Sequence, residues 1–302
     1  MNIEIKFPTK LTIYTLKEVL CQNFFDQAYD EIIIDLSNVD FIKPVGIAYT
    51  IAIIKYSMFK KIGKNYKIVK PNNKNVHNYL TRMNFYEMLN VNVQYPFIKH
   101  DSNGRFCEIK EVSNSNDVDI INKHIEEIIM QNIKEEYKLR NCISYSISEV
   151  IENIFHHSES PVNGFVCAQV YPQQKEFEIG IVDCGIGIKN SLSKKYNDIE
   201  NCIQAIEKAL ELNVTCKVDR SNAGEGLYFT KKFIEENGGE LAIYSGNGEY
   251  IYNNGLTRKS MDDNYYQGTI VHMKFDLNKY VDIKSIFDRE IPLSKYDFDD
   301  MF

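Results

Sequence analysis

The sequence predicts an α/β (α+β) protein that consists of two successive units. Short runs with the alternation of strands are separated by longer runs with apolar residues three and four positions apart, as in helices that pack on a sheet. A length of 302 residues suits about two domains, each with its own core. The polar, turn-rich stretch HDSNG predicts the boundary. We expect units at residues 1–100 and 101–290 and an acidic, aromatic tail at residues 291–302.

Composition and charge argue against several classes of protein. Hydrophobic residues make up 44% and charged residues 25%, which predicts a folded globular chain and not a disordered one. A formal net charge of -7 removes the broad attraction to nucleic-acid backbones. Seven scattered cysteines without a C-x-x-C pair argue against a disulfide framework and a zinc site. The N-terminus lacks the pattern of a signal peptide, and the best apolar run, residues 45–54, spans about half a bilayer, so we expect a cytoplasmic protein.

The first unit is expected to alternate strands and helices. Strands are predicted at residues 3–7, 31–35, 66–69 and 91–97. Helices are predicted at residues 16–29, 45–61 and 75–89. Strands that are separated by helices imply a mixed or parallel sheet with helices packed on it.

The second unit is expected to contain more antiparallel pairing. Strands are predicted at residues 106–112, 164–171, 175–183, 241–244 and 269–275, and helices at residues 120–133, 137–157, 198–212 and 227–237. The two strands around Pro172-Gln173-Gln174 predict an antiparallel hairpin. Residues 246–267 are rich in Gly, Asn and Asp and are predicted to form a long hairpin or an ordered loop.

Two polar motifs in the second unit indicate a ligand site. Glu149 and Asn153 lie one turn apart on a predicted amphipathic helix and point the same way. Asp183 ends a predicted strand, and Gly185 and Gly187 follow it. The glycines allow the backbone to approach a flat ligand closely, and the carboxylate can accept a hydrogen bond from an exocyclic amine. Alone, each motif is typical of ordinary structure: a solvated helix face and a glycine-rich turn.

A third motif follows about forty residues later. Gly224 and Gly226 precede a helix that includes Leu227, so free backbone N–H groups and the positive end of a helix can face an anion. The three motifs occur in one order and at workable spacing, so coincidence becomes the harder explanation.

In this order the motifs resemble the nucleotide-binding boxes of the histidine-kinase-type ATPase superfamily (GHKL, Bergerat fold). Glu149-x-x-x-Asn153 followed by His157 is similar to the N box, Asp183-x-Gly185-x-Gly187 to the G1 box, and Gly224-x-Gly226-Leu227 to the G2 box. Gly238-Gly239 and Gly268-Thr269 resemble the closing pattern. The resemblance covers residues 103–276 and implies an α/β sandwich that encloses ATP with Mg²⁺.

The resemblance also implies roles for residues. Asn153 would hold the magnesium ion, Asp183 would read the adenine amine, Thr269 would join the adenine hydrogen bonds, and residues 188–223 would form a lid. Glu149 resembles the general base of members that hydrolyse ATP or phosphorylate a protein hydroxyl. The lid residues Lys217 and Arg220 would reach the terminal phosphate or be exposed charges. The cofactor-binding set is Asn153, His157, Asp183, Gly185, Gly187, Gly224, Gly226, Leu227 and Thr269.

The first unit resembles the STAS domain of anti-sigma factor antagonists, through residues 32–47 (IIIDLSNVDFIKPVGI). Phosphorylatable members carry Asp-Ser-Ser/Thr-Gly where this chain has Lys43-Pro44-Val45-Gly46, so the acceptor hydroxyl is absent. Ser37 and Ser57 are nearby hydroxyls and are interpreted as ordinary loop and helix serines.

The two resemblances imply a cytoplasmic ATP- and Mg²⁺-binding regulator that hydrolyses ATP or phosphorylates a partner protein on Ser/Thr in partner-switching signalling. The expected partners are STAS-like or sigma-factor-type regulators; no direct nucleic-acid or membrane partner is expected, and a homodimer is left open. Two alternatives remain. One is a non-catalytic, nucleotide-gated scaffold, and the other, which the acidic charge disfavours, is a nucleic-acid-associated ATPase.

Overall fold

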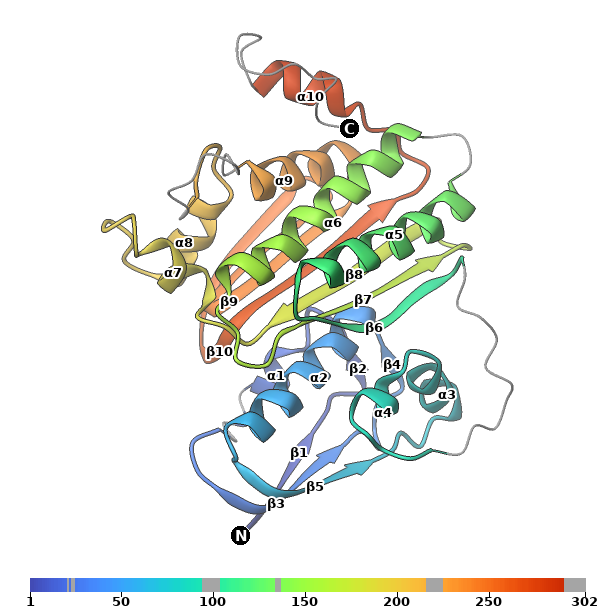
Figure 1. Ribbon diagram of the computed structural model, residues 1–302, viewed down its shortest axis with the longest axis vertical. Helices are drawn as coiled ribbons and strands as arrows, with labels where there is room; N and C mark the ends of the chain where they lie inside the picture. The colour runs from blue at the N-terminus through green and yellow to red at the C-terminus, as the bar shows by residue number, and fades with distance from the viewer. Residues whose placement is uncertain (21, 23–24, 94–103, 134–136, 216–224, 291–302) are drawn as a thin grey trace.

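The computed structural model describes residues 1–20, 22, 25–93, 104–133, 137–215 and 225–290. The described chain forms helices and three sheets: one of three strands, one of five strands and one of two short strands. The predicted α/β class is confirmed. Figure 1 shows the five-stranded sheet between two layers, with long helices on one face and the N-terminal elements on the other.

The N-terminal unit, residues 1–93, contains a parallel sheet in the order β1-β3-β5 and a two-stranded parallel pair, β2 and β4. The strands are β1 (Asn2–Lys6), β2 (Lys10–Leu11), β3 (Tyr29–Asp35), β4 (Phe41–Ile42) and β5 (Gly63–Val69). The helices are α1 (Lys17–Leu20), α2 (Pro44–Phe59), α3 (Lys74–Arg82) and α4 (Phe85–Met88). Helix α2 lies in the connection between the parallel neighbours β3 and β5, as expected because parallel strands need a long crossover.

Three predictions for this unit need correction. Of the helix expected at residues 16–29 the structure shows α1; residues 22 and 25–28 are not helical, and Tyr29 already pairs with Gly63 in extended conformation. The helix expected at residues 75–89 is divided into α3 and α4 by Asn84, which has the left-handed φ of 59° that Asn tolerates better than most residues. Residues 91–93 do not form the strand expected at residues 91–97, and residues 94–97 lie outside the described residues. Most of the predicted boundary at residues 100–104 also lies outside them; of this stretch, the structure describes only residue 104.

The five-stranded sheet of the second unit is antiparallel throughout and has the order β6-β7-β8-β10-β9. Its strands are β6 (Phe106–Val112), β7 (Gly164–Tyr171), β8 (Glu176–Asp183), β9 (Glu240–Asn253) and β10 (Leu256–Asp276). Its helices are α5 (Ser115–Asn132), α6 (Tyr137–His157), α7 (Gly187–Leu192), α8 (Cys202–Ala209), α9 (Gly226–Asn237) and α10 (Ile283–Glu290). The predicted β7–β8 hairpin is confirmed, and residues 246–267 extend β9 and β10 as a long hairpin.

Capping residues account for two helix boundaries that differ from the prediction. Helix α5 begins five residues earlier than expected, because Asn114 and Asp117 form a reciprocal capping box. Helix α8 is shorter than the expected residues 198–212, and the side chain of Asn201 accepts from Gln204 N at its start. Helix α8 and all but the first residue of α7 lie within the described part of the expected lid, residues 188–215.

The five-stranded sheet is apolar on both faces, because each face is covered. Ile179 and Ile181 belong to the core beneath the helices, whereas Val182 and Ile270 belong to one continuous core with the N-terminal unit. Helix α2 packs on β7 and β8 and is buried on nearly all sides, which explains its uniformly apolar sequence. Among the described residues, no helix has the length and apolar character needed to cross a membrane.

Candidate functional site

Asp183, the last residue of β8, is a buried carboxyl group on the helix-covered face of the sheet. It follows Ile181 by two positions and therefore points to the same side. Its side chain accepts hydrogen bonds from the backbone N–H of Gly185, at 2.7 Å, and of Thr269, its neighbour in β10. Burial raises the pKa of Asp183 to about 7, and the two N–H groups only partly oppose this shift. A hydrogen-bond donor from a ligand would favour the ionised form of this group.

The two glycines after Asp183 meet steric requirements of the turn. A Cβ at Gly185 would lie 1.8 Å from the carbonyl oxygen of Ser158, which also accepts from Ile186 N at 2.7 Å. Gly187 begins α7 with a φ of +74°, a conformation that L side chains rarely adopt. The turn therefore lies directly against the segment that follows α6, and a side chain at Gly185 would separate the two.

Ser245 joins this turn and was not among the predicted site residues. Its Oγ accepts from Ile188 N at 2.8 Å, donates to the carbonyl oxygen of Gly268 at 3.0 Å and lies 3.4 Å from the hydroxyl of Thr269. Thr269 lies beside Asp183, with which it pairs in the sheet. The signal for Ser245 was a hydroxyl next to a glycine at the end of the predicted strand 241–244, which is too common to single out.

Two predicted site residues from different motifs, Glu149 and Gly226, also come together. A Cβ at Gly226, the first residue of α9, would lie 2.0 Å from Oε2 of Glu149 in α6. Tyr145 lies one turn before Glu149 and forms a side-chain hydrogen bond to it. Burial, more than the Glu149 charge, raises the pKa of Tyr145, so its hydroxyl stays protonated and donates. The Glu149 carboxylate is consequently held at the positive end of α9.

Helix α6 links the pair to the Asp183 turn. Asn153 is half-buried one turn after Glu149, and α6 ends at His157, directly before Ser158. Figure 1 shows that β8 ends, α6 ends and α9 begins on the same side of the molecule, where α7 and α8 lie. Glu149, Asn153 and Asp183 therefore border one region at this end of the sheet.

The remaining predicted residues are placed in part. Leu227 is half-buried and packs against the core beneath the helices. His157 is the last residue of α6, but its side chain lies outside the described part of the structure. Gly224, Lys217 and Arg220, and with them residues 216–223 of the expected lid, also lie outside the described residues.

Asn153 could supply an oxygen ligand to a magnesium ion that arrives with a nucleotide. Within the described ranges, no group of three or more His, Cys, Asp and Glu residues could hold a metal ion. Magnesium bound to nucleotide keeps water and phosphate oxygens as ligands and needs only one or two protein oxygens, which Asn153 can supply. At positions 185 and 226 a side chain would collide with Ser158 and with Glu149, respectively, so both glycines are required by close packing.

The chain matches no protein-family model, and no curated protein sequence matches it. The function of the site is therefore inferred from its residues and contacts.

Proposed function

We propose that this protein binds ATP with magnesium at the end of the sheet where Asp183, Thr269, Glu149 and Gly226 lie, and that it transfers the terminal phosphoryl group to water or to a Ser/Thr hydroxyl of a partner protein. The observation that carries the proposal is the buried Asp183 carboxyl group. Two backbone N–H groups hold it in place. A carboxylate has about four lone-pair positions, so it can still accept a bond from the exocyclic amine of adenine.

The phosphates are assigned to the start of α9. The first turn of a helix presents unpaired N–H groups and a partial positive charge to an anion. Glu149 already places a carboxylate there, against Gly226, so phosphate binding at this end requires a cation that offsets both charges. Asn153, one turn further along α6, is the residue that would hold magnesium, and the bound ion would offset the charge of the phosphates.

Glu149 is assigned the role of general base. Its carboxylate would take the proton of the attacking water or hydroxyl as the new O–P bond forms and the bond to the departing ADP oxygen breaks. The hydroxyl of Tyr145 orients Glu149 by donating to it. The alternative, a scaffold that binds ATP without turnover, predicts no phosphate release.

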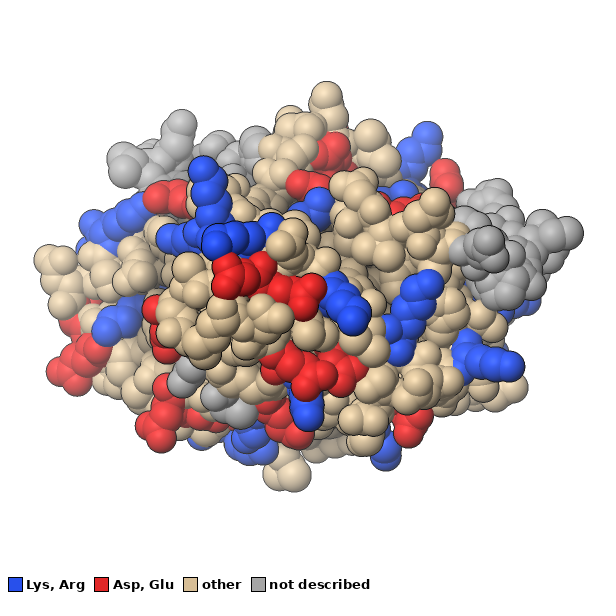
Figure 2. Space-filling model, turned by 90° about the horizontal axis from the view of Figure 1, so that it is seen from below, with Lys and Arg blue, Asp and Glu red and all other residues tan. Residues whose placement is uncertain are grey.

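Any phosphate acceptor is expected on another protein of the STAS-like or sigma-factor type. In the N-terminal unit the loop that resembles the phosphorylation site has no hydroxyl, and its Lys43 forms an ion pair with Glu178 of β8 at 2.6 Å. Direct nucleic-acid binding is not proposed. Figure 2 shows Lys and Arg side chains interspersed with Asp and Glu on the face formed by the N-terminal unit, without a broad area of one sign.

The test compares Glu149→Gln with Glu152→Gln, a half-buried glutamate on the same helix. Both variants should bind ATP, but only Glu149→Gln should lose turnover, by roughly 10²- to 10⁴-fold. Labelled ATP, supplied with magnesium and the proteins encoded nearby, shows whether phosphate reaches water or a protein. Equal turnover in both variants would refute the role of Glu149, and a wild type that binds no ATP would refute the function itself.

A further inference from the structure

The buried side chain of Tyr266 in β10 connects the Asp183 turn with the N-terminal unit. The Tyr266 hydroxyl donates to the carbonyl oxygen of Asp183 at 2.7 Å and lies 3.4 Å from the sulfur of Cys184. The Tyr266 ring lies 5.8 Å, between centroids, from the ring of Tyr49 in α2. Tyr266 is only 3% exposed and Tyr49 is fully buried. One side chain thus bridges α2 and the main chain that carries the Asp183 carboxyl group.

A second contact holds the same turn from the same direction. The thiol of Cys184 donates to the carbonyl oxygen of Ala52 in α2, at 3.5 Å. The consecutive residues Asp183 and Cys184 therefore both have contacts behind the sheet, on the side away from the proposed nucleotide. Gln267, the neighbour of Tyr266 in β10, also holds the turn, because its side-chain amide donates to the carbonyl oxygen of Gly185 at 2.9 Å.

Helix α2 is itself fixed on the sheet at its N-terminal end. Lys43, the residue before α2, forms the 2.6 Å ion pair with Glu178, which is 4% exposed, and its ammonium lies 4.1 Å from the centre of the Tyr171 ring. Gly180 leaves no room between β8 and α2, since a Cβ there would lie 2.3 Å from Cα of Val45. Breaking a buried charge pair is costly, so the start of α2 has one strongly preferred position.

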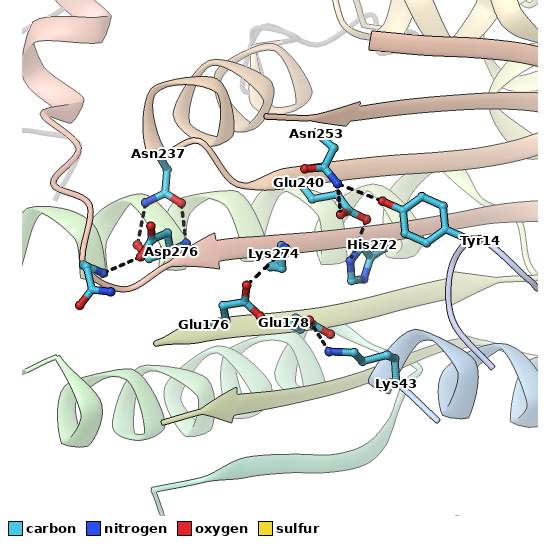
Figure 3. A network of polar contacts seen from close by, with 11 residues as sticks. Tyr14, Lys43, Glu176, Glu178, Asn237, Glu240, Asn253, His272, Lys274 and Asp276 are labelled. Carbon is cyan, nitrogen blue, oxygen red and sulfur yellow. Dashed lines mark hydrogen bonds and ion pairs between the residues drawn. The ribbon is translucent and has the colours of Figure 1, made fainter. Parts of the chain in front are cut away.

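Tyr14, in the N-terminal unit, also contacts this face of the sheet through a group of polar side chains. Figure 3 shows Tyr14, Glu240, Asn253 and His272 on this face, on the side of Lys274 away from the Asn237–Asp276 contact. The side-chain amide of Asn253 donates to the Tyr14 hydroxyl at 3.1 Å and to Glu240 at 2.7 Å. The N-terminal unit is consequently docked through both charged and polar contacts and not merely through apolar surface.

We propose that Tyr266 is a positioning residue of the nucleotide site and that α2, through Tyr266, sets the affinity of the site for ATP. The inference rests on the proposed function of the Asp183 turn and assigns its regulation to the N-terminal unit. Displacement of α2 would release the Asp183 carbonyl and change the direction of the carboxyl group that reads adenine. Because coupling is reciprocal, bound ATP must stabilise the docked position of α2 to the same extent.

The experiment measures ATP and GTP affinities of the full chain with Tyr266→Phe and the control Tyr244→Phe. Tyr244 is a buried tyrosine on the same face of the sheet, and its hydroxyl hydrogen-bonds to Glu249 and not to the Asp183 turn. Loss of one buried hydrogen bond should weaken ATP binding roughly fivefold in Tyr266→Phe. The preference for ATP over GTP should fall as well, since guanine has a carbonyl group in place of the adenine amine that would donate a hydrogen bond to Asp183. Tyr244→Phe should change neither quantity.

Hydrogen exchange on the same samples tests whether α2 is coupled to ATP binding. ATP should slow amide exchange in α2 of the wild type, and this protection should decrease in Tyr266→Phe while α3 is unaffected in both proteins. An unchanged ATP/GTP preference in Tyr266→Phe, or ATP protection that never reaches α2, would overturn the proposal and leave the proposed function standing. A wild type that binds no adenine nucleotide would overturn both.

Discussion

Replacement of Asp183 by Asn should change how the stability of the protein depends on pH. Burial raises the pKa of this carboxyl group from its ordinary value of 3.8 to about 7 in the folded protein. Between these values the unfolded chain has lost the proton and the folded chain retains it. Stability that is present below pH 4 is therefore lost as the pH rises through about 7. Asn has the same shape, keeps an oxygen for the N–H of Gly185 and does not titrate.

The size of the effect follows from the shift. A difference of about three pKa units at 1.36 kcal/mol per unit corresponds to about 4 kcal/mol. Both proteins are unfolded in urea between pH 4 and pH 8 and followed by circular dichroism. As the pH rises, the free energy of unfolding of the variant should increase by that amount relative to the wild type, mostly below pH 7. Other titrating groups are common to both proteins and cancel in the difference. Parallel curves, with a difference that stays constant across this range, would refute the burial argument.

The same variant tests the adenine assignment. The Asn amide would present N–H donors to a donor amine, so ATP affinity should fall by roughly tenfold or more. Asp35→Asn is a matched control, because Asp35 also ends a buried strand and accepts from the N–H two residues later, in Ser37, at 2.9 Å. Asp35→Asn should bind ATP like the wild type. Equal affinity in all three proteins would remove Asp183 from the site.

Three further substitutions test the packing that surrounds the site. Gly226→Ala should cost about 1–3 kcal/mol in urea unfolding and reduce ATP turnover, because the new Cβ would meet the carboxylate of Glu149; full activity would contradict this. Gly180→Ala should destabilise the protein by a similar amount, since the α2 backbone would lie 2.3 Å from the new Cβ. The variant should also become more sensitive to limited proteolysis in the N-terminal unit, and a wild-type digestion pattern would count against this prediction. Lys43→Met should lower the free energy of unfolding by about 3 kcal/mol or more, because it leaves Glu178 buried without its partner. The double variant with Glu178→Gln should recover much of this stability, and additive effects would show that the two groups are not coupled.

The sequence by itself determined the elements whose patterns are local. Strand β7 and helix α6 lie at the predicted residues, and the Asp183 turn follows β8 as expected. Alternating and 3.6-residue periodicity records which side of an element is buried, and glycines mark turns that side chains would obstruct. These signals lie within a few residues of one another and can be recognised without knowledge of the partner element.

Only the tertiary structure decided what the predicted elements pack against. An apolar helix such as α2 has the same sequence pattern whether it covers one sheet or lies between two, and its position against β7 and β8 depends on contacts such as Lys43–Glu178, which are 135 positions apart. Ser245 and Tyr266 were missed for the same reason. Their hydroxyls acquire a role only when distant strands place them beside Asp183, and no spacing along the chain records that proximity.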